Sequence, residues 1–166
     1  MITIREYTEE DAELVGRLIA NTYSQFNLAH LSPEEVKLAL GPFQHAWSQD
    51  EAHKEKIASV IRSEWVFVAV DEDEIVGVIR GRQGRLASLF VSSNYQRQGV
   101  ATKLVERFEE ECQKYAPMVI RLSATVYAVS FYIKMGYKRS TGIRSGWSFD
   151  YHGLPVQSMR KVLNAE

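Results

Sequence analysis

The part of this sequence best suited to chemistry is a turn between an apolar run and an amphipathic helix. Residues 89–91 read Leu-Phe-Val, residues 96–99 read Gln-Arg-Gln-Gly, and apolar side chains then recur every three or four positions over residues 100–112. Helix N-termini favour anions, because their first N–H groups are unpaired and the helix dipole is positive there. An anion site is therefore predicted, with Gly99 leaving the backbone uncovered and Arg97 adding positive charge. A glycine at such a turn is also a common structural device, so the turn alone leaves both interpretations open.

The elements that must hold this turn follow the order β-α-α-α-β-β-β-α-β-α-β-β. Runs of β-formers predict strands, and apolar residues at helical spacing predict helices, one of them behind the capping box Ser32-Pro33-Glu34-Glu35. We expect strands over residues 1–7, 65–70, 75–79, 86–91, 119–124 and 145–163, the last broken by a turn at His152-Gly-Leu-Pro155. We expect helices over about residues 8–26, 32–41, 50–62, 100–113 and 129–135. This order implies a mixed sheet with helices on both faces, an α+β fold bordering on α/β.

Length and composition limit the class of protein. With 166 residues, 45% hydrophobic and 25% charged, the chain is expected to fold as one domain over residues 1–166. The formal net charge of −1 argues against a nucleic acid or an anionic membrane as partner. Cys112 is the single cysteine, no segment resembles a signal peptide or a membrane helix, and no residues have metal-ligand spacing. We therefore expect a cytoplasmic protein without disulfides or a bound metal.

Two motifs resemble those of one family. Gln96, Gly99 and Ala101 match the Gln/Arg-x-x-Gly-x-Gly/Ala signature of the GCN5-related N-acetyltransferase (GNAT) superfamily. Residues 128–137, Ala-Val-Ser-Phe-Tyr-Ile-Lys-Met-Gly-Tyr, resemble its Ala-x-x-Phe-Tyr-x-x-x-Gly-Phe/Tyr segment. The motifs are specific over residues 86–137, and two compatible motifs in order carry more weight than one. The resemblance implies the acyl-CoA N-acyltransferase fold, with a mostly antiparallel sheet of about six or seven strands.

The resemblance also implies acetyl-CoA as co-substrate. It places the diphosphate on residues 96–102 and the pantetheine arm along the exposed edge of the strand at residues 89–91. Two positions depart from the family pattern, because many members have Pro where Ser93 stands and Asn where Thr125 stands. The expected cofactor contacts are Leu89, Phe90, Val91, Gln96, Arg97, Gln98, Gly99, Val100, Ala101, Thr102, Thr125 and Ala128.

One residue matches the family's catalytic position. Tyr132 is the candidate general acid, because a tyrosine with a pKa of about 10 can protonate the leaving thiolate. The alternative is that Phe131, Tyr132 and Tyr137 are all core aromatics on a short helix. The base is not identified; Glu64 is a candidate that would act through water, but the role of a solvated acid at a helix end explains it better. Cys112 is expected to be an inert core thiol, because its helix position faces the sheet.

These features predict an N-acetyltransferase that transfers the acetyl group of acetyl-CoA to a primary amine by direct attack in a ternary complex. The amine belongs to a small molecule or to a protein or peptide. The alternative is a non-catalytic acyl-CoA-binding or regulatory module of the same fold. A nucleotide-binding phosphate loop is disfavoured, because no Gly-Lys-Ser/Thr is present. The resemblance allows a homodimer. It leaves the acceptor open, and the candidates for its pocket are Tyr23, Phe26, His30, His45, Trp47 and His53.

Overall fold

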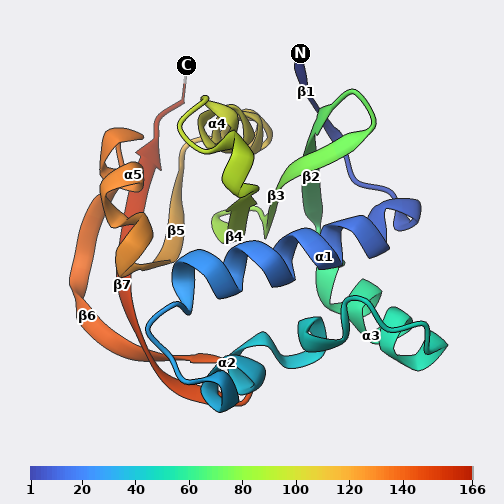
Figure 1. Cartoon of the computed structure of the whole chain (residues 1–166). Helices are drawn as coiled ribbons and strands as arrows, with labels where there is room; N and C mark the ends of the chain where they lie inside the picture. The colour runs from blue at the N-terminus through green and yellow to red at the C-terminus, as the bar shows by residue number, and fades with distance from the viewer. Residues whose placement is uncertain (166) are drawn as a thin grey trace.

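The computed structural model describes residues 1–165 and is built on a seven-stranded sheet in the order β1-β2-β3-β4-β5-β7-β6 (Figure 1). The strands are β1 (Ile2–Glu6), β2 (Trp65–Asp71), β3 (Glu74–Arg82), β4 (Arg85–Val91), β5 (Met118–Thr125), β6 (Lys138–Ser148) and β7 (Tyr151–Leu163). The helices are α1 (Ala12–Thr22), which Tyr23–Asn27 continues, α2 (Pro33–Leu40), α3 (Glu51–Ile61), α4 (Val100–Gln113) and α5 (Val129–Lys134). The predicted order of elements and the α+β fold are confirmed.

One pair of strands differs from the rest of the sheet. β4 and β5 run parallel and are connected through α4, whereas the other neighbouring strands are antiparallel. Only Arg85 and Arg121 are paired between β4 and β5, so the two strands diverge toward their carboxyl ends. Within the described chain, the β4 edge over residues 89–91 consequently has no strand partner on its β5 side.

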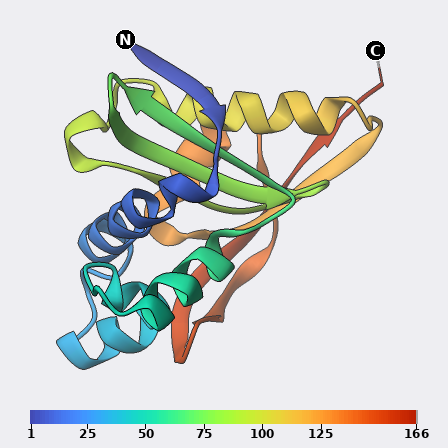
Figure 2. The ribbon, with the colours of Figure 1, turned by 90° about the vertical axis from the view of Figure 1, so that its right-hand side faces the viewer.

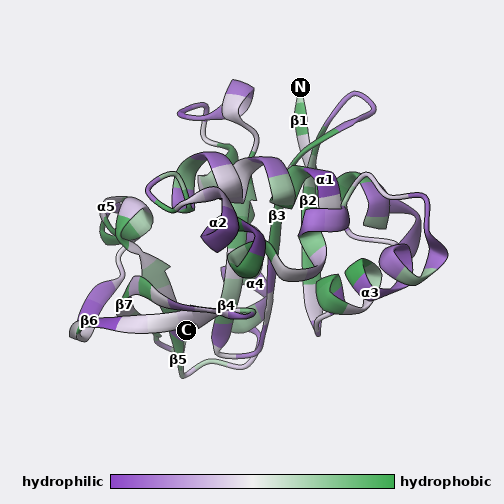
Figure 3. Ribbon diagram, turned by 60° about the horizontal axis from the view of Figure 1, so that its bottom comes forward, coloured by the Kyte–Doolittle hydropathy of each residue, from purple (hydrophilic) through white to green (hydrophobic). Residues whose placement is uncertain are grey.

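Hydrophobic residues form a core on each face of the sheet. On one face α4 buries side chains such as Leu104 and Phe108, and on the other α1 and α3 bury side chains such as Ile19 and Ile61. Figure 2 shows α4 on the opposite side of the sheet from these helices. In Figure 3 hydrophobic colour concentrates on β2 and β3. The packing fixes the N-terminus of α4 beside the end of β4. No helix within residues 1–165 is both long and apolar enough to span a membrane.

The hairpin of β6 and β7 corrects one expectation. The predicted turn at His152–Pro155 is wrong, because β7 runs through these residues and the chain reverses at Phe149 and Asp150. Two tertiary contacts explain the position of the turn: the Phe149 ring packs 6.0 Å from that of Phe43, and the Asp150 N–H donates to the Leu38 carbonyl at 3.2 Å. Glycine and proline favour turns locally, but these contacts outweigh that preference. β6 also begins earlier than expected.

Candidate active site

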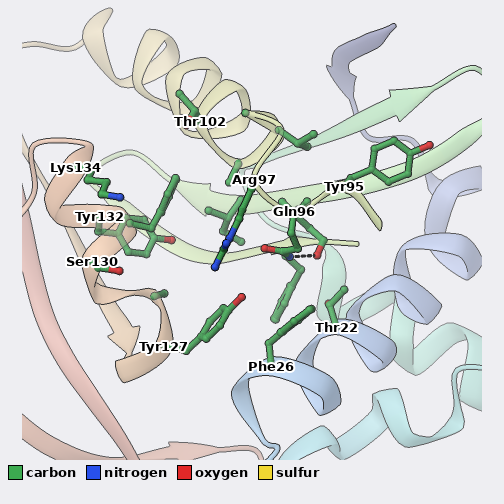
Figure 4. Close-up of a pocket in the computed structure, with 18 of the residues that line it drawn as sticks. Thr22, Phe26, Tyr95, Gln96, Arg97, Thr102, Tyr127, Ser130, Tyr132 and Lys134 are labelled. Carbon is green, nitrogen blue, oxygen red and sulfur yellow. Dashed lines mark hydrogen bonds between the residues drawn. The ribbon is translucent and has the colours of Figure 1, made fainter. Parts of the chain in front are cut away.

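A cavity of about 620 Å³ opens where β4 and β5 diverge, beside the N-terminus of α4 (Figure 4). Its walls come from the end of α1 and its continuation, the edge of β4, the turn into α4, and α5 with the segment before it. Tyr132 and ten of the twelve expected cofactor contacts line it. The ten are Leu89, Phe90, Val91, Gln96, Arg97, Gly99, Val100, Ala101, Thr102 and Ala128.

The turn into α4 presents bare backbone to the cavity. Gly99 caps the helix with a φ of 80°, and no atom lies within 4 Å of the point where a β-carbon would stand. The first N–H groups of the 14-residue helix have no acceptor inside it. The turn can therefore bind an anionic group such as a diphosphate at close range.

The three side chains before Gly99 have different roles. Gln96 Nε2 donates to the Val91 carbonyl at 2.6 Å, which ties the turn to the end of β4. Gln98 lies outside the lining, and its Nε2 donates to the Asn94 carbonyl at 2.9 Å. Arg97 is exposed, and Figure 4 shows its guanidinium directed into the cavity. Arg97 is thus the charged side chain of the turn that can reach an anionic ligand.

Thr125 is the other expected contact that does not line the cavity. Its Oγ1 accepts a hydrogen bond from Asn27 Nδ2 at 2.7 Å, and Asn27 does line the cavity. Many family members have asparagine at the position of Thr125. In this chain an asparagine amide reaches the same neighbourhood from the continuation of α1.

Tyr132 belongs to the core and to the cavity at once. Its ring is only 5% exposed and packs edge-on against Phe131 and Tyr137, at centroid distances of 5.1 and 5.6 Å. Its hydroxyl points toward the cavity in Figure 4 and has no hydrogen-bond partner among the described residues. A phenol is protonated at neutral pH, and burial raises the pKa of Tyr132 above its ordinary value, so its proton is held more tightly. The side chain can donate a proton and is not suited to accept one.

Several residues in the wall of the cavity opposite the turn into α4 were not predicted from the sequence. Phe26 and Tyr127 stack with ring centroids 5.4 Å apart, and Ser130 and Lys134 also line the cavity. Phe26 was one of several acceptor candidates, whereas the other three were not singled out. No local pattern links Phe26 to Tyr127, because only the fold brings the end of α1 to the segment before α5.

Other residues singled out from sequence lie elsewhere. His45 and His53 stack on each other at 3.9 Å and line a separate hollow. Glu64 is exposed, accepts the Gln83 N–H at 3.1 Å and does not line the cavity. Cys112 is fully buried, and burial raises the pKa of its thiol, which fits an inert side chain. Within residues 1–165, no three His, Cys, Asp or Glu side chains are grouped so as to hold a metal ion.

Comparison with solved structures finds the same fold at low identity. A GCN5-related N-acetyltransferase from Rhodopseudomonas palustris is 20% identical with a TM-score of 0.77, over 97% of this chain and 95% of that one. The PaiA N-acetyltransferase from Thermoplasma acidophilum, solved in complex with coenzyme A, is 18% identical with a TM-score of 0.73, over 98% of this chain and 99% of that one. A search of curated proteins finds no match.

A family model covers nearly the whole chain. Residues 9–163 match the acetyltransferase (GNAT) domain. This span includes the turn at Gly99, the diverging strands and the segment that carries Tyr132. The chain belongs to the GNAT acetyltransferase family.

Proposed function

We propose that this protein is an N-acetyltransferase that transfers the acetyl group of acetyl-CoA to a primary amine by direct attack in a ternary complex. The observation that carries the proposal is one cavity that joins three features: the open N-terminus of α4, the unpaired edge of β4 and the Tyr132 hydroxyl. A protein of the same fold was solved with coenzyme A, which supports the same ligand for this cavity.

The shape of the cavity suits an elongated, anionic ligand. The N–H groups of the turn around Gly99 and the Arg97 guanidinium bind the diphosphate. The edge of β4 at residues 89–91 has free backbone groups, so it can hydrogen-bond the amides of the pantetheine arm as a neighbouring strand would. This placement brings the thioester into the gap between β4 and β5, next to Tyr132.

Side chains and backbone groups of the cavity then have separate roles in acyl transfer. Acetyl-CoA supplies an activated acetyl thioester, at which a C–N bond forms and the C–S bond breaks. A backbone N–H of β4 donates to the oxyanion that develops on the carbonyl oxygen. Tyr132 gives its proton to the leaving thiolate. No carboxylate lines the cavity among the described residues, so water is the acceptor we propose for the proton of the attacking amine.

Replacement of Tyr132 by Phe tests this mechanism, because it removes the hydroxyl and keeps the ring. We expect kcat to fall by about 10²- to 10⁴-fold, the usual contribution of a general acid, with the affinity for CoA unchanged. Thiol release from acetyl-CoA measures the first quantity and calorimetry the second. Tyr137→Phe is the matched control, since Tyr137 is also buried but donates to Glu109 at 2.8 Å outside the cavity. Equal turnover in Tyr132→Phe and the wild type would refute the assignment.

The alternative, a non-catalytic acyl-CoA-binding module, gives a different result in the same assay. The wild type would bind CoA but release no thiol with polyamines, aminoglycosides, amino acids or peptides with free amines. The position of the Tyr132 hydroxyl in the wall of the cavity favours catalysis over this alternative.

A further inference from the structure

The face of the sheet opposite α4 carries arginines that the proposed reaction does not use. Leu86 and Ile120 belong to the core under α4, so their sequence neighbours Arg85 and Arg121 point to the opposite face. Residues paired across neighbouring strands point to the same face of a sheet, so the pairing identifies further arginines on the face of Arg85 and Arg121. The register places Arg80, Arg82, Arg85, Arg121, Arg144 and Arg160 on this side, which we call the arginine face.

No carboxylate of residues 1–165 neutralises the arginine face. None of its six guanidinium groups forms an ion pair with an acid in residues 1–165. Elsewhere arginines do have such partners, for example Arg5 with Asp11 at 2.8 Å and Arg107 with Glu111 at 2.6 Å. Six arginines without such a partner therefore share one face of the described sheet.

Two of the arginines converge on one hydroxyl group. Arg85 and Arg144 each direct an Nη2 atom at Ser123 Oγ, at 3.2 and 3.0 Å. Burial, followed by the charges of Arg144 and Arg82, lowers the pKa of Arg85 below its ordinary value. Like charges repel each other, and a serine hydroxyl carries no charge to offset this. An anion between the two guanidinium groups would offset this repulsion.

Arg80 is even less well satisfied. It lies opposite Ser88 in the pairing of β3 and β4, and both Arg80 Nε and Ser88 Oγ are buried without a hydrogen-bond partner in the described chain. Burial lowers the pKa of Arg80, and no acid acts in the other direction. Buried polar atoms without partners are uncommon in proteins, and each calls for an explanation such as a water or an ion at that place. A ligand that supplies acceptor oxygens would satisfy both atoms.

The arginine face begins where the cavity ends. Ser88 alternates along β4 with Phe90, so both point to the same face, and Phe90 lines the cavity. Arg85 marks the point beyond which β4 and β5 separate. A molecule whose amine lies in the gap between these strands can therefore extend its other end onto Arg80 and Arg85.

The β6–β7 hairpin limits how large that molecule is. It curls beneath the sheet toward α2 (Figure 1). Ser148 Oγ donates to the Ala39 carbonyl at 2.8 Å and lies 2.6 Å from the Tyr23 hydroxyl, so the end of the hairpin is fastened to α2 and to the continuation of α1. The hairpin therefore covers the sheet on the side of α2, which favours a small acceptor over a folded protein.

We propose that the acceptor is a small amine that also carries an oxyanion, a carboxylate or a phosphate, and that Arg80, Arg85 and Arg144 bind this group. The inference rests on the proposed acetyl transfer and names the chemical class of its substrate. Guanidinium groups suit both oxyanions, because their N–H donors match the geometry of two acceptor oxygens.

Binding of simple anions tests the arginine face without knowledge of the acceptor. The protein is saturated with CoA, so that the turn at Gly99 is filled, and titrated at constant ionic strength with inorganic phosphate, succinate and neutral succinamide. We expect one of the two anions to raise the melting temperature saturably and succinamide to have no effect. The better anion identifies the group. Arg80→Gln and Arg85→Gln should each weaken this binding at least tenfold.

Arg139→Gln is the matched control. Arg139 is on β6 like Arg144 but pairs with Met159, which belongs to the core under α4, so it points to the other face. This variant removes the same charge and should bind the anion as the wild type does. The inference is overturned if no anion binds saturably, or if Arg80→Gln and Arg139→Gln bind alike.

Turnover of paired amines completes the test. Phosphoethanolamine is compared with ethanolamine, and amino acids with their amides, by thiol release. The acidic member of the productive pair should have the higher kcat/KM, and Arg80→Gln should abolish this preference. If neutral amines are preferred and anions do not bind, the inference fails while acetyl transfer stands. If anions bind through Arg80 but no amine releases thiol, the proposed function fails and the arginine site stands.

Discussion

Gly99→Ala distinguishes two roles of the glycine at the turn into α4: its left-handed backbone conformation and the space that it leaves for the cofactor. Gly99 has a φ of 80°, and an added β-carbon would meet no protein atom within 4 Å. The cost to the folded protein is therefore conformational only, about 1–2 kcal/mol for an L-residue in the left-handed region. For a chain of this size, each kcal/mol lowers the melting temperature by roughly 2–4 °C, so we expect a decrease of about 2–8 °C.

The effect on cofactor binding should be larger, because the methyl group would project into the space where the diphosphate approaches the N–H groups of the turn. Loss of one hydrogen bond to a charged group costs about 1.5–3 kcal/mol. This corresponds to a roughly 10- to 150-fold increase in the Kd for CoA. Calorimetry with CoA measures the affinity, and thermal denaturation of the free protein measures the stability.

Gly84→Ala is the control that isolates backbone strain. Gly84 has nearly the same φ, 79°, and an added β-carbon would be in ordinary contact, 3.4 Å from Met118 Cε and Val119 O. Gly84 does not line the cavity. Both variants should lose similar stability, but only Gly99→Ala should lose affinity for CoA. Wild-type affinity in Gly99→Ala, or equal loss in Gly84→Ala, would refute the placement of the diphosphate.

Three further predictions concern single side chains. Arg80→Met should raise the melting temperature by about 2–12 °C, because it removes a buried polar atom whose lack of a partner costs about 1–3 kcal/mol, while anion binding is lost; an unchanged or lower value in thermal denaturation would contradict this. Asp11→Asn should destabilise the protein at neutral pH, because the hydrogen bond from Arg5 lowers the pKa of Asp11. That stabilisation is present above the unfolded pKa of about 3.9 and is lost as pH falls through the lower folded pKa, so melting curves of wild type and variant should converge below about pH 4. Cys112 should react with a thiol reagent only as fast as the protein opens, and fast labelling of the native protein would show that it is not buried.

The order of elements and the open turn before α4 were predictable because both depend on residues close together in the chain. The helix from Val100 has its apolar residues at helical spacing, and the capping box at Ser32 forms as expected, with the Ser32 N–H donating to Glu35 at 3.0 Å. The turn at Gly99 follows from the junction of these local patterns. The family motifs added Tyr132, which the structure places in the same cavity.

What the sequence could not supply are contacts between distant segments. The reversal at Phe149 depends on α2, and the partner of Thr125 is Asn27 from the far end of α1. Local conformational preferences do not predict such contacts, because the stabilising energy comes from packing and hydrogen bonds that form only in the folded chain.

The amino-acid sequence by itself determined the fold class, the family and the position of the turn into α4, since each follows from residues close together in the chain. Only the tertiary structure decided the acceptor side of the site. Arg80, Arg85 and Arg144 come from three strands and are scattered among other charged residues in a chain of net charge −1. Strand register places them on one face, because alternate residues of each strand point to the same side of a sheet.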